Sequence, residues 1–456
     1  MLIRGVGLRG AVAINTITMI GIGPLITIPL VLGALHGPRS LVGWIAGAVL
    51  ALCDGLVWAE LGSRYPGSGG TYGYLRAVFG PHKLGALLSF IFVWQTIVSV
   101  PLLQASGYIG FANYAGYLLP QLSTNPMAQK MVAIGVGIVT LLALYRGITA
   151  VAKVGVVLAV IVLFTLACVI AAAFTHFSPA QAFALGAGDS FWNGLRAGFG
   201  PALIVAMYDY VGYGAANTIG DEVIAPQRTL PRAIVIAIGL VAAAYIALQT
   251  GVLGAIRWET IVPRADGSLP ALGQYVASAV VERSFGVPAA VVVTLLILIT
   301  AFASVYGNLL GFSRIPFAAA SDGAFFAAFA HVHPRHRFPD RALLVIGLLA
   351  LPACFFSLDA AIAWLTAGVV LIQPIGQLAA LAAMRLRGER APFRMWLYPV
   401  PALVALTGWI FVFLSSGTAA MAFGLGSVAL AMLAFLIGAR RRAAWPFTAL
   451  EPRLPG

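Results

Sequence analysis

Two short segments carry the groups best suited to bind a small zwitterion. The first, with the sequence Gly-Ile-Gly-Pro-Leu, runs from Gly21 to Leu25 in the middle of an apolar stretch over residues 13–34. Glycine lets the backbone leave a helix without a side-chain clash, and proline suits the first turn of a restarting helix. The N–H groups of Ile22, Gly23 and Leu25 would then be free at the positive end of the second half-helix and could bind a carboxylate. A kinked helix that packs closely through small residues is the structural alternative.

The second segment is rich in tyrosine and carries a carboxylate. It contains Tyr208, Asp209 and Tyr210, followed by Gly212 and Tyr213. If a helix ends near Tyr210, its last carbonyl groups lack intrahelical donors and suit an ammonium group. Together the two breaks would form a dipolar site for an amino acid, with Tyr210 and Tyr213 as its lid and wall. Aromatic packing between helices is the alternative for either tyrosine.

Three carboxylates, Asp54, Glu60 and Asp209, fall within or near the apolar stretches. A charge at the centre of a membrane helix costs about 2.5–3.5 kcal/mol on insertion scales, so each carboxylate needs a partner or a proton. We expect Glu60 to pair with basic residues near the cytoplasmic face, and Asp54 to bond backbone or neutral side chains. Asp209 adjoins the predicted site, where it would attract a cationic substrate or titrate as a coupling group. A structural pairing toward the outside is the alternative for Asp209.

Candidates for ion coupling include two hydroxyls as well as two of these carboxylates. Thr300 and Ser304 lie among apolar residues of a later stretch and could face the first break to complete a sodium site, alongside Asp54 and Asp209 as possible coupling groups. Lone hydroxyls in membrane helices commonly bond their own backbone instead.

The three cysteines all fall in apolar stretches, and the histidines do not cluster as ligands. The sequence therefore predicts no metal site and no cofactor.

Composition predicts that these segments are embedded in a membrane. The chain is 61% hydrophobic and 9% charged, with a mean hydropathy of +0.97, which is typical of a polytopic helical membrane protein. The net charge is +13, but with the N-terminus inside, 21 of the 27 Lys and Arg fall in cytoplasmic segments. This bias predicts an integral protein of the inner or plasma membrane with both termini in the cytoplasm. No basic run is interleaved with aromatics, so nucleic acid is not an expected partner.

Twelve apolar stretches organise the chain into a single transmembrane domain over 1–456. The first and sixth stretches contain the two breaks, so residues 13–174 and 197–384 would form two repeats of five spans each. Five is odd, which makes the second repeat inverted relative to the first. Two additional helices over 396–439 lie outside the repeats. The predicted spans are 13–34, 41–63, 84–112, 128–146, 150–174, 197–220, 233–255, 287–312, 341–357, 360–384, 396–416 and 418–439.

Two long motifs resemble those of a known family. The segment AELGSRYPGSGGTYGYLRAVFG over 59–80 resembles the span 2–3 motif of the amino acid–polyamine–organocation (APC) superfamily, and EVIAPQRTLPRAI over 222–234 resembles its turn after span 6. The resemblance implies an all-α polytopic fold of the LeuT type, with about 12 transmembrane helices, a 5+5 inverted repeat and broken helices 1 and 6. It also implies alternating access around a central site. By the same resemblance, the amides at 22, 23 and 25 take a substrate carboxylate, and the carbonyls of Tyr208 to Tyr210 take its amine.

The chain departs from the family pattern at three positions. Ile22 stands where a small residue is usual, which narrows the space beside the carboxylate site, and Pro24 replaces a residue that carries an amide hydrogen. In many members of the family, a lysine in span 5 is linked to proton coupling. The position similar to it is Val162 in this chain, and Lys153 lies nearer the cytoplasmic end. The resemblance therefore carries no lysine proton route over to this chain.

These observations predict a secondary active transporter for an amino acid or related amine, coupled to H⁺ or Na⁺ or working by exchange within the lipid bilayer. A polyamine or cationic amino-acid permease is the alternative, and Asp209 would distinguish the two if it faces the site. A passive channel would need a polar stripe along one continuous helix. A membrane enzyme would need a catalytic cluster or a phosphate loop, and the glycines at 67–70 lack the lysine of such a loop.

Overall fold

The computed structural model describes residues 4–67, 69–146, 151–185, 191–264, 268–334 and 338–447, and only the backbone of 146 and 151–159. The side chain of Lys153 is thus outside the described part. Within it the regular structure is helical, apart from one isolated bridge between Val6 and Val223. The α-helices are α1 (Leu8–Met19), α2 (Gly23–Leu35), α3 (Ser40–Arg64), α4 (Thr71–Phe79), α5 (Leu84–Leu118), α6 (Pro120–Ser123), α7 (Pro126–Arg146), α8 (Val151–Thr175), α9 (Pro179–Ala182), α10 (Phe191–Tyr210), α11 (Pro226–Ala255), α12 (Ala271–Gln274), α13 (Val276–Ser321), α14 (Asp340–Ala353), α15 (Leu358–Val370), α16 (Gln373–Leu386), α17 (Val400–Ser415) and α18 (Thr418–Arg441). The 3₁₀ helices are η1 (Gly37–Arg39), η2 (Ala215–Thr218), η3 (Gly220–Glu222), η4 (Trp258–Thr260) and η5 (Ala327–Ala330).

Seven helical segments in the described part are long and apolar enough to cross a membrane, and α1 with α2 makes an eighth if this bent pair is one span. Two further apolar helices, over Val160–Thr175 and Val400–Ser415, are shorter. The chain is therefore an all-helical protein with the apolar spans of a polytopic membrane protein. Fewer segments meet this length than the twelve spans predicted from the sequence, because several helices are short, broken or joined. Helix α14, for example, has 14 residues.

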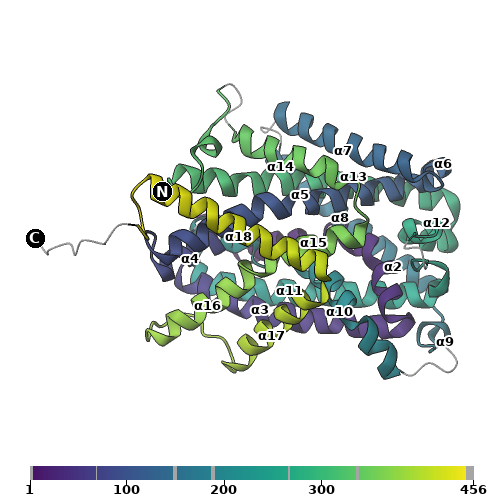
Figure 1. Ribbon diagram of the computed structural model, residues 1–456. Helices are drawn as coiled ribbons and strands as arrows, with labels where there is room; N and C mark the ends of the chain where they lie inside the picture. The colour runs from purple at the N-terminus through teal and green to yellow at the C-terminus, as the bar shows by residue number, and fades with distance from the viewer. Residues whose placement is uncertain are drawn as a thin grey trace, which may run out of the picture.

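The helices form one bundle with two distinct ends (Figure 1). The long helices α5 and α13 pack against each other, and α11 packs against α3. The short helices α6, α9 and α12 lie at one end of the bundle, whereas α4 lies at the other. The sequence places the first three in segments on one side of the membrane and α4 in a segment on the other, and the two sets of loops lie at opposite ends of the bundle. Which end faces the cytoplasm stays a prediction.

The apolar stretch at the N-terminus is broken where its glycines and proline predict. Helix α1 ends at Met19, α2 begins at Gly23, and the two are bent by 51°. The stretch predicted over 197–220 is also interrupted, because α10 ends at Tyr210 and only a turn and the 3₁₀ helix η2 follow. At Gly212, φ is 132°, and a Cβ there would collide with the backbone of Thr18 and Met19. Glycine is needed at this position for both reasons.

The helix predicted over 287–312 begins after a kink at Gly286, as predicted, and extends further at its C-terminal end, to Ser321. Helix α13 runs from Val276 to Ser321 but is not regular, since Gly286 has a φ of 80°. This left-handed residue divides α13 into two helices that meet at a kink. The longer second part carries Thr300 and Ser304.

Candidate binding site at two helix breaks

The first break presents two unsatisfied backbone donors, not the three that the sequence predicts. The N–H of Leu25 donates to the carbonyl of Ile22 at 3.0 Å, because the first turn of α2 is tight. The N–H groups of Ile22 and Gly23 have no hydrogen-bond partner among the described residues. A site for a carboxylate at the N-terminus of α2 would therefore consist of the amides of Ile22 and Gly23.

The two breaks contact each other and share one tyrosine. Gly212 lies against the backbone of Thr18 and Met19. The hydroxyl of Tyr245, on α11, lies 2.9 Å from the carbonyl oxygen of Met19 and 3.1 Å from that of Asp209. This hydroxyl therefore bridges the ends of α1 and α10. Sequence reasoning missed Tyr245, whose only signal is one tyrosine hydroxyl in an otherwise mainly apolar helix.

A further link joins α1 to the segment after α10. Asn15 is fully buried, and its Oδ1 accepts a hydrogen bond of 2.8 Å from the N–H of Ala216. The side chain thus satisfies a backbone donor that the interrupted helix leaves without an intrahelical partner. Both breaks are held by groups from the opposite segment, so they form one structural unit.

Asp209 points from α10 to the start of α2. Its side chain is buried, with 2% exposure, and its Oδ2 accepts a hydrogen bond of 2.6 Å from the hydroxyl of Thr27. Its Oδ1 has no partner in the described part of the chain. A Cβ built on Gly23 would overlap this oxygen, so the carboxylate lies directly beside the α-carbon of Gly23. Thr27 is a second residue that sequence reasoning missed.

Tyr208 and Tyr210, at the end of α10, contact different helices. The hydroxyl of Tyr208 lies 2.7 Å from that of Ser106 on α5. Tyr210 is fully buried, with its ring 6.1 Å from that of Trp44 and 5.3 Å from that of Tyr245. Tyr210 therefore packs among aromatic side chains between helices, which the sequence analysis gave as the alternative to its role as a lid of the site.

Tyr213 links the second break to Asp54. Its hydroxyl donates to Oδ2 of Asp54 at 2.6 Å, and the indole N–H of Trp409 donates to Oδ1 at 3.0 Å. Asp54 is buried on α3, with 1% exposure. As expected from the sequence, its partners are neutral side chains, and both of its oxygens are satisfied. Asp54 thus ties the break to α3 and α17.

Ser304 faces the first break, as expected. A Cβ on Gly21 would lie 2.7 Å from the Ser304 hydroxyl oxygen. The hydroxyl of Thr300, one turn away on α13, is buried and has no partner among the described residues. No group of three or more His, Cys, Asp or Glu within the described ranges could hold a metal ion. The two hydroxyls are neutral oxygen ligands, and that of Ser304 lies beside Gly21.

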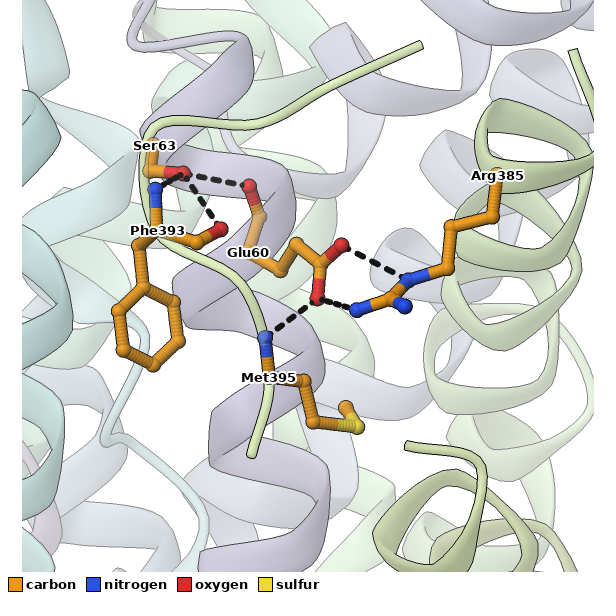
Figure 2. A network of polar contacts seen from close by, with 5 residues as sticks. All are labelled: Glu60, Ser63, Arg385, Phe393 and Met395. Carbon is orange, nitrogen blue, oxygen red and sulfur yellow. Dashed lines mark hydrogen bonds and ion pairs between the residues drawn. The ribbon is translucent and has the colours of Figure 1, made fainter. Parts of the chain in front are cut away.

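Glu60 forms an ion pair away from the breaks (Figure 2). Arg385 on α16 donates to its two oxygens at 2.9 and 2.6 Å, and the N–H of Met395 donates at 2.7 Å. The expected pairing of Glu60 with a basic residue is therefore confirmed. Figure 2 also shows Ser63 beside Phe393, so the end of α3 is fixed to the segment after α16 at two points.

The neighbouring contact involves more exposed groups. Arg64 lies 3.3 Å from the carboxylate of Glu389, and the hydroxyl of Tyr65 donates to the same oxygen at 2.9 Å. Burial and then the neighbouring carboxylate raise the pKa of Tyr65 to about 12. Tyr65 therefore stays a neutral donor at physiological pH. We name the contacts of Glu60, Ser63 and Arg64 with Arg385 and residues 389–395 the α3–α16 latch.

A cavity of about 610 Å³ lies near α6 and α12, at the end of the bundle opposite α4. Its polar lining includes Asn113, Gln129, Lys130, Arg264 and Asp359. None of the residues predicted for the site lines it. The cavity is thus separate from the groups at the two breaks.

Comparison with known proteins covers nearly the whole chain. A family model described as amino acid permease matches residues 7–446. An uncharacterised transporter of Mycobacterium tuberculosis is 29% identical over 382 residues, which are 83% of this chain and 80% of the relative. The serine/threonine exchanger SteT of Bacillus subtilis is 27% identical over 428 residues, 90% of either chain. Human cationic amino acid transporter 4 is 26% identical over 392 residues, 80% of this chain and 58% of the relative.

Proposed function

Since this chain belongs to the amino acid permease family of the APC superfamily, we propose that it is a secondary transporter that carries an amino acid across the cell membrane by alternating access. The observation that carries the proposal is the contact between the two helix breaks, which brings unsatisfied amides and a buried carboxylate together. Irregular backbone at membrane depth is tolerated where it is enclosed by protein or lines a cavity. Interrupted helices of this kind are typical of transporter binding sites.

The proposed site uses the backbone for both ends of the substrate. The amides of Ile22 and Gly23 would bind the substrate carboxylate, with Gly21 providing the turn before them. The carbonyls near Tyr208 and Tyr210 would bind the ammonium group. The carbonyl of Asp209 already accepts a hydrogen bond from the hydroxyl of Tyr245. We retain Gly212 and Tyr213 as residues that shape the second break.

The proposed architecture is the LeuT type with twelve spans. Its repeats would be 13–174 and 197–384, followed by helices over 396–439, with both termini in the cytoplasm. Support comes from a break at the start of each proposed repeat and from the grouping of α6, α9 and α12 at one end of the bundle. An inverted second repeat places corresponding breaks at the same depth.

Coupling to H⁺ or Na⁺ and obligatory exchange are the two modes proposed. Exchange is favoured by the similarity to SteT, whose name describes a serine/threonine exchanger. Asp209 and Asp54 are the carboxylates available for a proton, and Thr300 and Ser304 are the hydroxyls available for sodium. A cationic substrate is the second candidate, because Asp209 carries a buried oxygen without a described partner.

The proposal is tested by uptake into proteoliposomes. A panel of labelled amino acids and polyamines is offered with an imposed proton gradient, with a sodium gradient, and with unlabelled substrate trapped inside. Saturable uptake driven by one gradient establishes a symporter, and uptake that requires internal substrate establishes an exchanger. Non-saturating conductance would indicate a channel, and no uptake of any panel member would contradict amino-acid transport.

A further inference from the structure

Asp209 is a buried carboxylate without a positive partner among the described residues. Its Oδ2 is occupied by Thr27, and its Oδ1 is unsatisfied there. Burial of a charged carboxylate is costly unless the charge is paired or neutralised. Asp54, by contrast, has both oxygens satisfied by neutral donors. Among the described residues, Asp209 is therefore the one of the two buried carboxylates with an oxygen free to take a proton or another donor.

The helices that pack against α10 bring no described basic side chain to Asp209. Helices α2 and α17 carry no titratable residue. The remaining packed elements and α10 itself carry Arg39, Cys53, Asp54, Glu60, Arg64, Arg196, Tyr208, Tyr210, Arg228, Arg232, Tyr245 and Asp359. Of this set, the charge of Asp209 acts on Tyr208, Tyr210 and Tyr245, and none of these three side chains is basic. Arg39 lies against Gly194, fifteen residues before Asp209 in the chain and roughly 22 Å along the helix.

The unsatisfied oxygen faces the place where the proposed function puts the substrate carboxylate. It lies beside the α-carbon of Gly23, whose N–H is one of the two unsatisfied amides. A carboxylate that accepts from this N–H would lie within about 8 Å of Oδ1, adding covalent and hydrogen-bond lengths. Two carboxylates that share a buried site favour uptake of a proton by one of them.

We propose that Asp209 binds one proton together with the substrate carboxylate, so that each amino acid crosses with one H⁺. The inference rests on the proposed function, since it assumes that an amino acid binds between the breaks. The proton binds at Oδ1 from the side on which the substrate enters, and it leaves on the side of release. Substrates with a free α-carboxylate would be the ones whose binding depends on this proton.

The test compares substrates that differ only in the carboxylate. Binding of L-serine, L-leucine and L-lysine to the purified protein is measured over a range of pH beside ethanolamine, isoamylamine and cadaverine. We expect the affinity for the amino acids to fall by about tenfold per pH unit on the alkaline side. The three amines should show no such fall, because they bring no second carboxylate.

Two variants test whether Asp209 is the group that binds the proton. Asp209→Asn should bind the same amino acid without pH dependence, and in proteoliposomes it should exchange substrate but lose accumulation driven by a proton gradient. Thr27→Val keeps the carboxylate but removes its donor, so the midpoint of the pH dependence should move to higher pH. Asp359→Asn, a matched change at an exposed residue, should keep the pH dependence of the wild type.

The outcomes separate this inference from the proposed function. Unchanged pH dependence in Asp209→Asn, or its loss in Asp54→Asn instead, would overturn the assignment to Asp209. An equal fall in affinity for amines and amino acids would overturn the role of the substrate carboxylate. If no member of any pair binds the wild type, the proposed function itself fails, and this inference with it.

Discussion

At the residue scale, Gly23 provides the space that the Asp209 carboxylate occupies. Any side chain at position 23 would meet this carboxylate and the ring of Tyr208. A requirement for glycine often reflects a backbone conformation that other residues rarely adopt, but φ at Gly23 is not in the left-handed region. The requirement here is close approach between two helices, not an unusual backbone conformation.

Gly23→Ala should reduce transport by at least tenfold while the protein still inserts into the membrane. The added methyl group displaces the Asp209 carboxylate and separates the breaks. Gly239→Ala is the control, because no atom lies within 4 Å of a Cβ there. Uptake and the amount of protein in the membrane are measured for both. Normal uptake by Gly23→Ala would remove the first break from the site.

Tyr245→Phe should slow transport and lower the free energy of unfolding by about 1 kcal/mol, because the bridge between the carbonyls of Met19 and Asp209 is lost. Initial uptake rates and thermal unfolding in detergent report the two effects. Tyr145→Phe serves as the control, since its hydroxyl bonds no described residue. Equal behaviour of the two variants would contradict a bridging role for Tyr245.

At the element scale, α3 is fixed at one end while α1 and α2 are divided. The α3–α16 latch holds the end of α3 by an ion pair with a buried carboxylate and by backbone contacts. The exposure of Glu60 is 1% and that of Arg385 is 17%, whereas Arg64 and Glu389 are 42% and 29% exposed. The two ion pairs of the latch should therefore differ in strength, because water screens the second.

Arg385→Gln should destabilise the protein by about 3–5 kcal/mol, since it leaves the carboxylate of Glu60 buried without its cation. The matched change Arg64→Gln should cost less than about 1 kcal/mol. Thermal unfolding of the two purified variants measures the difference. In Glu60→Gln with Arg385→Gln, part of the stability should return, because no buried charge remains unpaired. Similar losses in the two single variants would show that burial does not distinguish the pairs.

At the scale of the whole molecule, the arrangement of the loops separates two ends of the bundle. The connections that contain α6, α9 and α12 lie at one end, and α4 lies at the other (Figure 1). The distribution of Lys and Arg predicts that the α4 end faces the cytoplasm. The three native cysteines are buried or half-buried, which gives a low background for labelling.

Thr124→Cys and Ser321→Cys test this orientation. Both positions are exposed, the first beside α6 and the second at the end of α13. In intact cells, a maleimide that does not cross the membrane should label Thr124→Cys only. After the cells are opened, both variants should be labelled. Labelling of Ser321→Cys in intact cells would reverse the proposed orientation.

The membrane-protein class, the family and the first break follow from the amino-acid sequence alone. These properties depend on local rules: hydrophobic length, glycine and proline in an apolar stretch, and motifs over 59–80 and 222–234. The end of α10 at Tyr210 and the pairing of Glu60 with a basic residue were predicted in the same way.

Which groups meet at the breaks depends on how the helices pack, and no local sequence pattern specifies it. Apolar helices carry little information about their rotation, because faces toward lipid and toward other helices are equally apolar. The sequence therefore did not reveal that Tyr245 bridges the two breaks or that Thr27 holds Asp209. The use of the Leu25 N–H within α2 also depends on the tight turn there. The unsatisfied oxygen of Asp209 faces Gly23 because helix packing turns α10 toward α2, and no local rule fixes that rotation.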